Sequence, residues 1–124
     1  MEYRRFGRTN WDVGEIGYGM WGLAGWTGSE RQEVNDALDR AVSLGCNFFD
    51  TAWAYGSGLS EQILGGLMKR HRGKIFHYAT KIPPKNLKWP SRREYALEDC
   101  FPADHIIAYT EKSLKNLGVE SIAL

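Results

Sequence analysis

The sequence lacks the residue patterns that mark disulfide-stabilised and metal-binding proteins. Its two cysteines, Cys46 and Cys100, are too few and too far apart for a disulfide framework or a cysteine-based metal site, so both are expected to be reduced. The three histidines, His71, His77 and His105, do not show the His-x-x-x-His spacing of a helical metal site. We therefore expect the chemistry of this chain to involve no metal.

Long apolar runs and an excess of one charge are also missing. No apolar run approaches the roughly 18 residues that a membrane span needs, and residues 1–5 lack the apolar core of a signal peptide. The 16 lysines and arginines nearly balance the 15 aspartates and glutamates, which argues against a general nucleic-acid or membrane-surface binder. The composition thus indicates a globular protein, and a cytoplasmic location is expected by default.

Short apolar segments predict the strands of the chain. Residues 3–6 and 11–15 flank a glycine-bearing turn and predict a β-hairpin. A glycine-rich strand is expected over residues 16–20, where missing side chains let another group approach the backbone. Further strands are expected at Phe48-Phe49, over residues 75–81, and from Ser121 to Leu124.

Amphipathic helices are predicted between these strands. Ser29 and Gln32 form a capping-box pattern ahead of a helix that closes at Gly45. A second helix is expected from a Ser60 cap to Gly73. A third begins at Pro102 and ends at Gly118, with its buried face formed by Ile106, Ile107, Thr110, Leu114 and Leu117.

The alternation of strands and helices indicates a parallel sheet covered by helices. Residues 82–101, with Pro83, Pro84 and Pro90, form a long irregular connection, which in compact domains is usually functional or carries local structure of its own. A (β/α)8 barrel takes about 250 residues, so the chain is expected to form roughly the first half of one.

Two strand ends carry the polar residues of a candidate active site. Asp50 follows Phe48-Phe49 directly, Tyr55 comes shortly afterwards, and Lys81 ends the strand that begins at residue 75. If the strands are parallel neighbours, the three side chains emerge at one edge of the sheet. A phenol has an ordinary pKa near 10, and an ammonium within about 4–6 Å favours its ionised form. With a carboxylate that orients the lysine, such a phenol can deliver a proton to a carbonyl oxygen near pH 7.

Proton delivery to oxygen is half of a carbonyl reduction, and the other half is a hydride. No side chain supplies a hydride, so the three residues imply a nicotinamide cofactor. Each residue alone also has an ordinary explanation: Asp50 as a capping carboxylate, Tyr55 as a loop aromatic, and Lys81 as a solvated strand end. Their joint placement at the ends of neighbouring strands favours the active site.

A series of short motifs runs through the chain in order. The most specific is Phe49-Asp50-Thr51-Ala52 leading to Tyr55-Gly56, and the others lie at residues 3–9, 15–19, 45–48, 60–65, 79–81 and 113–118. Through these motifs the chain resembles the aldo-keto reductases, NADPH-dependent enzymes that reduce aldehydes or ketones to alcohols. The resemblance implies an α/β fold: the N-terminal portion of a (β/α)8 TIM barrel, preceded by a β-hairpin that caps the barrel bottom.

The resemblance also implies roles for particular residues. Tyr55 matches the general acid, Lys81 and Asp50 match its tuning partners, and Asp50 also lies near the nicotinamide ribose. The positions that match those beside the nicotinamide are Gly19, Met20 and Trp21. Those that match the lining of the substrate pocket are Trp21, Trp53 and Ala54.

One family feature has no counterpart in this sequence. The family's fourth catalytic residue, a histidine, ends the fourth barrel strand, and here that strand stops at Leu124. The phosphate-binding loops of the family follow later still, and no Gly-x-Gly-x-x-Gly loop replaces them. We therefore expect residues 1–124 to be a partial domain, truncated in the fourth barrel strand and weakly active or inactive alone.

Two alternatives remain open at this point. The chain could belong to a cofactor-sensing regulatory subunit, as some channel-associated relatives do. It could also be a half-barrel that associates with itself through exposed sheet edges.

Overall fold

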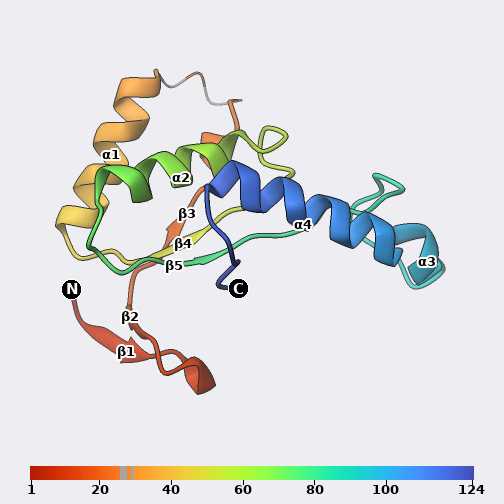
Figure 1. The fold of residues 1–124 in the computed structure, drawn as a ribbon, viewed down its shortest axis with the longest axis horizontal. Coiled ribbons are helices and arrows are strands. Elements are labelled where there is room, and N and C mark those ends of the chain that lie inside the picture. Colours follow the sequence, from red (N-terminus) through yellow and green to blue (C-terminus); the bar gives the residue numbers. More distant parts are fainter. Residues whose placement is uncertain (26–27, 29) are drawn as a thin grey trace.

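The computed structural model describes residues 1–25, 28 and 30–124. Its elements, in chain order, are β1 (Tyr3–Arg5), the 3-10 helix η1 (Gly7–Thr9), β2 (Asp12–Gly14), β3 (Tyr18–Gly19), the 3-10 helix η2 (Trp21–Leu23), α1 (Arg31–Ser43), β4 (Phe48–Asp50), α2 (Leu59–Arg70), β5 (His77–Ala79), α3 (Leu97–Cys100) and α4 (Ala103–Leu117). Figure 1 shows this path, with α1, α2 and α4 on one side of the strands. The arrangement confirms the expected α/β class.

The three central strands form a parallel sheet in the order β3-β4-β5. Gly19 is the register partner of Asp50, and Asp50 is in turn the partner of Ala79. The ladder continues past the strand ends, because the Thr51 amide donates to the Ala79 carbonyl at 2.9 Å. The carboxyl ends of all three strands therefore meet at one edge, as a β/α barrel requires.

The hairpin β1–β2 packs against the opposite edge of this sheet. The Trp11 ring stacks on His77, the first residue of β5, with 4.6 Å between centroids, and Phe6 contacts Phe48 at the start of β4. The Asn47 side chain accepts from the Gly14 amide and donates to the Asp12 carbonyl. The hairpin thus covers the amino ends of the strands, as predicted, and leaves the carboxyl ends open.

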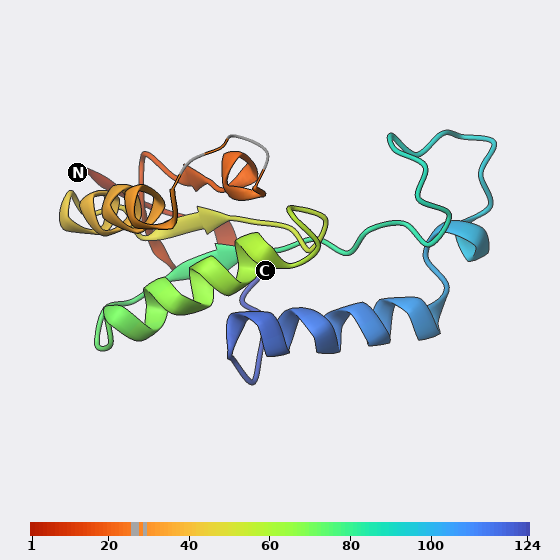
Figure 2. The same cartoon turned by 90° about the horizontal axis from the view of Figure 1, so that it is seen from above.

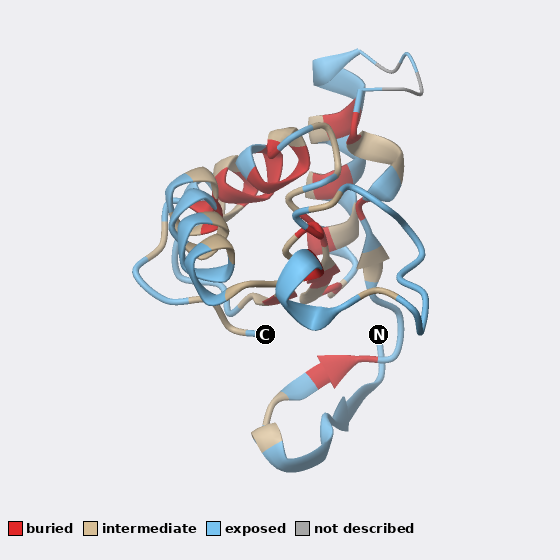
Figure 3. Cartoon of the chain, turned by 90° about the vertical axis from the view of Figure 1, so that its right-hand side faces the viewer, coloured by how far each residue is buried: buried red, intermediate tan, exposed pale blue. Residues whose placement is uncertain are grey.

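A single hydrophobic core joins the helices to the sheet. Its fully buried side chains include Phe49 of β4, Leu38 of α1, Leu64 and Leu67 of α2, and Leu117 of α4. Each fully buried side chain of this size contributes roughly 1.5–3 kcal/mol of transfer free energy. Figure 3 shows the buried stretches concentrated on α2 and in the strands, whereas the surface of α4 is mostly exposed or intermediate.

Two helices begin differently from the prediction. The N-cap of α1 is Glu30, whose side chain and that of Glu33 form the capping box, and Ser29 lies outside the described residues. The N-cap of α2 is Gly58, with φ +95°, so Ser60 is not a cap but lies inside the first turn and is fully buried. A left-handed glycine is an easy way to turn the chain into a helix, and it frees Ser60 for another contact.

The predicted buried face of α4 is wrong at its amino end, where Ile106 and Ile107 are exposed. Figure 2 shows why: the first half of α4 extends beyond the sheet, together with α3 and the irregular segment 82–101, so no strand lies beneath it. Ser113 and Leu117, nearer the sheet, are buried. Helical periodicity identifies a face, but not how far the neighbouring layer reaches.

The expected strand at residues 121–124 is not formed as regular structure. One ladder-like bond is present, from the Thr80 amide to the Leu124 carbonyl at 3.0 Å, and the Tyr78 hydroxyl donates to the Ser121 carbonyl. The segment thus lies beside β5, where a fourth strand would run, but too few backbone bonds fix it. None of the helices in the described ranges combines the length and apolar character of a membrane span.

Candidate active site

An ion pair joins the ends of β4 and β5. Lys81 Nζ lies 2.6 Å from Asp50 Oδ1 and donates a second hydrogen bond to the Thr51 carbonyl at 2.8 Å. The two side chains are about half exposed, at 50% for Lys81 and 42% for Asp50. The pair is therefore held in one geometry by two contacts while it remains accessible from the open edge of the sheet.

Tyr55 lies in the turn that connects β4 to α2. The centroid of its ring is 5.5 Å from Lys81 Nζ. Its amide donates to the Ala52 carbonyl, and its carbonyl accepts from the Ser60 amide, so the backbone on both sides of Tyr55 is tied down. The structure thus brings together the acid, the phenol and the amine that the sequence placed at neighbouring strand ends.

A pocket of about 350 Å³ opens beside Tyr55 and Lys81. Most of its lining is apolar, which suits the binding of a small organic molecule. The lining residues are Trp21, Ala52, Ala54, Tyr55, Lys81, Ile82, Pro83, Pro84 and Trp89. Trp21 and Ala54, two of the three residues expected to line a substrate pocket, are among them.

The third of these residues, Trp53, points elsewhere. Its ring makes an edge-to-face contact with Tyr109 of α4, with centroids 4.6 Å apart, and lies 5.6 Å from Lys112 Nζ. It is not among the residues that line the pocket. Trp53 is the first residue of the turn that follows β4, and its side chain packs against α4, whereas Ala52, Ala54 and Tyr55 line the pocket.

Of the residues expected beside the nicotinamide, Gly19 is exposed at the open edge of the sheet and Met20 is buried in the core. Gly19 is exposed at the end of β3, next to Asp50 in register, and a Cβ added there would meet no atom within 4 Å. Met20, by contrast, is fully buried in the core, and only its backbone reaches the rim, where its amide donates to the Asp50 carbonyl. The end of β3 thus presents open backbone beside the Asp50 carboxylate.

Besides Ala52, four pocket residues were not predicted as site residues from the sequence: Ile82, Pro83, Pro84 and Trp89. All four belong to the irregular segment that follows β5. A signal was present, because loops that leave the carboxyl ends of barrel strands usually build the active site. Trp89 is 79% exposed, so it forms the outer wall of the pocket rather than part of the core.

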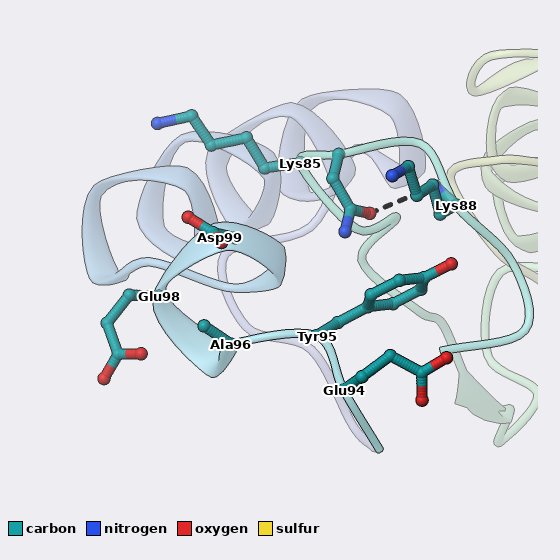
Figure 4. Close-up of a pocket in the computed structure, with 8 residues that line it drawn as sticks. Lys85, Lys88, Glu94, Tyr95, Ala96, Glu98 and Asp99 are labelled. Carbon is teal, nitrogen blue, oxygen red and sulfur yellow. Dashed lines mark hydrogen bonds between the residues drawn. The ribbon is translucent and has the colours of Figure 1, made fainter. Parts of the chain in front are cut away.

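A second hollow, of about 390 Å³, lies within the same irregular segment (Figure 4). Its charged side chains, which include Lys85, Glu94 and Glu98, point in different directions and do not converge on one point. Lys88 Nζ lies 5.2 Å from the centroid of the Tyr95 ring. No cluster of metal-ligating side chains occurs in the part of the chain that the structure describes. We therefore assign no chemistry to this hollow.

The two cysteines take no part in the candidate site. Cys46 and Cys100 are both buried and unpaired. Burial raises the pKa of the Cys46 thiol, although hydrogen bonds with the backbone of Phe48 and Tyr18 act in the opposite direction. A thiol of this kind is a poor nucleophile.

Comparison with known proteins extends the sequence resemblance. A family model described as the Aldo/keto reductase family matches residues 15–124. The chain is 36% identical over 114 residues to the aldo-keto reductase yakc of Schizosaccharomyces pombe, a match that covers 90% of this chain and 32% of the relative. It is also 36% identical, over its full length, to the oxidoreductase YqkF of Bacillus subtilis, of which it covers 38%.

Solved structures give the same result. The aldo-keto reductase AKR11C1 of Bacillus halodurans, in its holo form, superposes with a TM-score of 0.74 at 28% identity, over 98% of this chain and 38% of that one. The chain thus spans about a third of the length of the curated relatives it matches. Its fold corresponds to the N-terminal portion of their (β/α)8 barrel.

Proposed function

The chain belongs to the aldo/keto reductase family, and on this premise we propose that the protein reduces aldehydes or ketones to alcohols with NADPH. The observation that carries the proposal is the contact of Lys81 with both Asp50 and Tyr55 at the mouth of an apolar pocket. An acid group beside a pocket for a small organic molecule is the arrangement that carbonyl reduction needs.

In this proposal Tyr55 is the proton donor. Its hydroxyl gives a proton to the carbonyl oxygen as that oxygen gains negative charge. The Lys81 ammonium, which lies 5.5 Å from the centroid of the Tyr55 ring, stabilises the phenolate that remains, because a nearby positive charge favours the ionised form of a phenol. Asp50 holds the ammonium in place through the 2.6 Å ion pair.

NADPH is the proposed cofactor, and its nicotinamide end is proposed to lie at the carboxyl ends of β3 and β4. When bound, it supplies the hydride that reduces the carbonyl carbon. The residues of this chain that would hold its nicotinamide end are Gly19, through open backbone, the backbone of Met20, Trp21, and Asp50 near the ribose. The relative yakc carries NADP(+) in its name, which supports the same choice.

The substrate pocket is proposed to be formed by Trp21 and Ala54, together with Trp89 and the two prolines that follow Ile82. The apolar lining beside Tyr55 favours carbonyl compounds with an apolar or aromatic substituent. Trp53 is left out of this proposal, because it packs against Tyr109.

The direct test uses the complete protein that contains this chain. NADPH and NADH are titrated by fluorescence, and oxidation of each is then followed with a panel of aliphatic, aromatic and sugar aldehydes and ketones. We expect tighter binding of NADPH and turnover of the apolar carbonyl compounds. Cofactor binding without turnover of any carbonyl would instead favour a cofactor-sensing subunit of the same fold.

A further inference from the structure

The first turn of α2 connects the ends of all three strands of the sheet. It contains Ser60 and Glu61, two polar residues whose side chains are fully buried. Burying such groups is costly unless each finds hydrogen-bond partners, so their contacts show what the turn holds together.

Ser60 ties together the ends of β3 and β4. Its hydroxyl donates to the Met20 carbonyl at 3.2 Å and lies 2.7 Å from Thr51 Oγ1. A hydroxyl has one proton, so with the Ser60 proton directed to Met20, the Thr51 hydroxyl is the donor in the second bond. Thr51 directly follows Asp50, and its carbonyl accepts from Lys81 Nζ.

Glu61 ties the end of β5 to α4. The Thr80 hydroxyl donates to Oε1 at 2.7 Å, and the Asn116 side-chain amide donates to Oε2 at 2.8 Å. Thr80 directly precedes Lys81. Both carboxylate oxygens thus have a donor, which is the condition for burying this group without a large loss of stability.

We propose that Glu61 and Ser60 are positioning residues for the reaction, acting through Thr80 and Thr51. These two threonines adjoin Lys81 and Asp50, and they are held by consecutive residues of one helical turn. The turn therefore sets the separation of the acid and the amine, and with it the place of the ammonium beside Tyr55. The inference rests on the proposed function, because it assigns a role within the same site.

The principal test replaces Thr80 with valine in the complete protein. Valine keeps the shape of threonine but cannot donate a hydrogen bond to Glu61. The residue that precedes Lys81 therefore loses its contact with α2. We expect kcat to fall about 10- to 100-fold, because a misplacement of about 1 Å can cost two orders of magnitude. The KM of the carbonyl substrate and the Kd of NADPH should change less than about threefold. Thr80→Ser, which restores the hydroxyl, should recover most of kcat.

The matched control is Asn116→Ala, which removes the other donor to Glu61 on the side that faces α4. A purely structural role of the network predicts that T80V and N116A lower Tm and activity in parallel, and that result would overturn the proposal. The proposal requires that T80V and N116A lower Tm by similar amounts, and that only T80V lowers kcat. If T80V does not fold, Ser60→Ala, which releases Thr51, must show the same selective loss.

The proposed function and this inference fail in distinguishable ways. A wild-type protein that reduces no carbonyl compound contradicts the proposed function, and with it this inference. A wild-type enzyme that depends on Tyr55 but is unaffected by both T80V and S60A contradicts the positioning role alone.

Discussion

Lys81 Nζ lies 5.5 Å from the centroid of the Tyr55 ring, although the two residues belong to different segments of the chain. Tyr55 belongs to the turn after β4, and Lys81 follows the end of β5. Their proximity results from the parallel register of the two strands, in which Asp50 faces Ala79. The parallel pairing of β4 and β5 therefore brings the residues of the candidate active site together.

Replacing Tyr55 with phenylalanine should remove the proton donor and little else. We expect kcat for carbonyl reduction to fall by about 10²- to 10⁴-fold, the usual contribution of general acid catalysis. The Kd of NADPH from fluorescence titration should stay within about twofold. Tyr95→Phe, in the second hollow, is the matched control and should leave kcat unchanged. Near-normal turnover in the Tyr55 variant would contradict the assignment.

Replacing Asp50 with asparagine should weaken the hold on Lys81. The amide keeps the shape of the side chain and an oxygen that can accept a hydrogen bond from Lys81, but it removes the negative charge, so the contact with the ammonium becomes weaker while the bond to the Thr51 carbonyl remains. We expect kcat to fall at least 10-fold in steady-state assays, because the geometry of reacting groups is sensitive to small displacements. Asp99→Asn, whose carboxylate lines the second hollow, serves as the control. Unchanged kinetics in the Asp50 variant would show that the ion pair is not used.

Replacing Trp89 with alanine should open the outer wall of the pocket. Because Trp89 contributes apolar lining beside Tyr55, we expect KM for an aromatic aldehyde to rise by about 10-fold, which corresponds to about 1.4 kcal/mol. The KM of a small aliphatic aldehyde and the Kd of NADPH should change little. The control is Leu87→Ala, since Leu87 is 81% exposed and does not line the pocket. Equal changes for both aldehydes would argue against a role of Trp89 in specificity.

Two adjacent glycines of α2 should respond in opposite directions to alanine. A Cβ on Gly65 would lie 2.6 Å from the Leu117 carbonyl oxygen, where α2 packs against α4. A Cβ on Gly66 would meet only the end of the Arg70 side chain, at an ordinary contact distance of 3.6 Å. Gly65→Ala should therefore cost about 1–3 kcal/mol of unfolding free energy, whereas Gly66→Ala should gain up to about 1 kcal/mol. Denaturant unfolding of the complete protein measures both.

The Asp39 carboxylate should contribute a pH-dependent part of the stability. Burial tends to raise the pKa of Asp39, but hydrogen bonds from His71 and Arg70, together with their charges, outweigh it and lower the pKa overall. Because the folded-state pKa is depressed, the stabilisation is present above the unfolded pKa of about 3.9 and is lost as the pH falls through the folded value.

Replacing Asp39 with asparagine should therefore lower Tm at pH 7, and the difference from wild type should shrink as the pH falls below the unfolded-state pKa of about 3.9. Asp36→Asn is the control, because Asp36 accepts a hydrogen bond from Gln32 that asparagine can still accept. A difference in Tm that persists unchanged into acid would exclude the ionised carboxylate as its source.

Local sequence signals predicted the elements of this fold well. The turn at residues 7–10, the apolar pair Phe48-Phe49 and the glycine at position 118 each act through nearby backbone geometry, and the structure places a hairpin, a strand and a helix end there. The prediction failed where a local pattern competed with packing. Ser60 has the side chain of a helix cap, but its hydroxyl is used to bond Thr51 and Met20 instead.

The candidate site was predictable only in part, for the same reason. Asp50 and Lys81 could be brought together from the sequence because parallel strands deliver their carboxyl ends to one edge. Trp89 could not be assigned, because no periodicity fixes where an irregular segment folds. Nor could the sequence show that Ala54 lines the pocket while Trp53 packs against Tyr109, because these contacts depend on where distant segments lie.

By itself, the sequence determined the hairpin, the three parallel strands β3 to β5, the three long helices, and the gathering of the acid, the phenol and the amine, because these depend on short-range patterns and on the direction of the strands. Only the tertiary structure decided which side chains line the pocket and which residues hold the strand ends. Those contacts join segments that are distant in the chain, and their geometry is set by the packing of α2 between the sheet and α4.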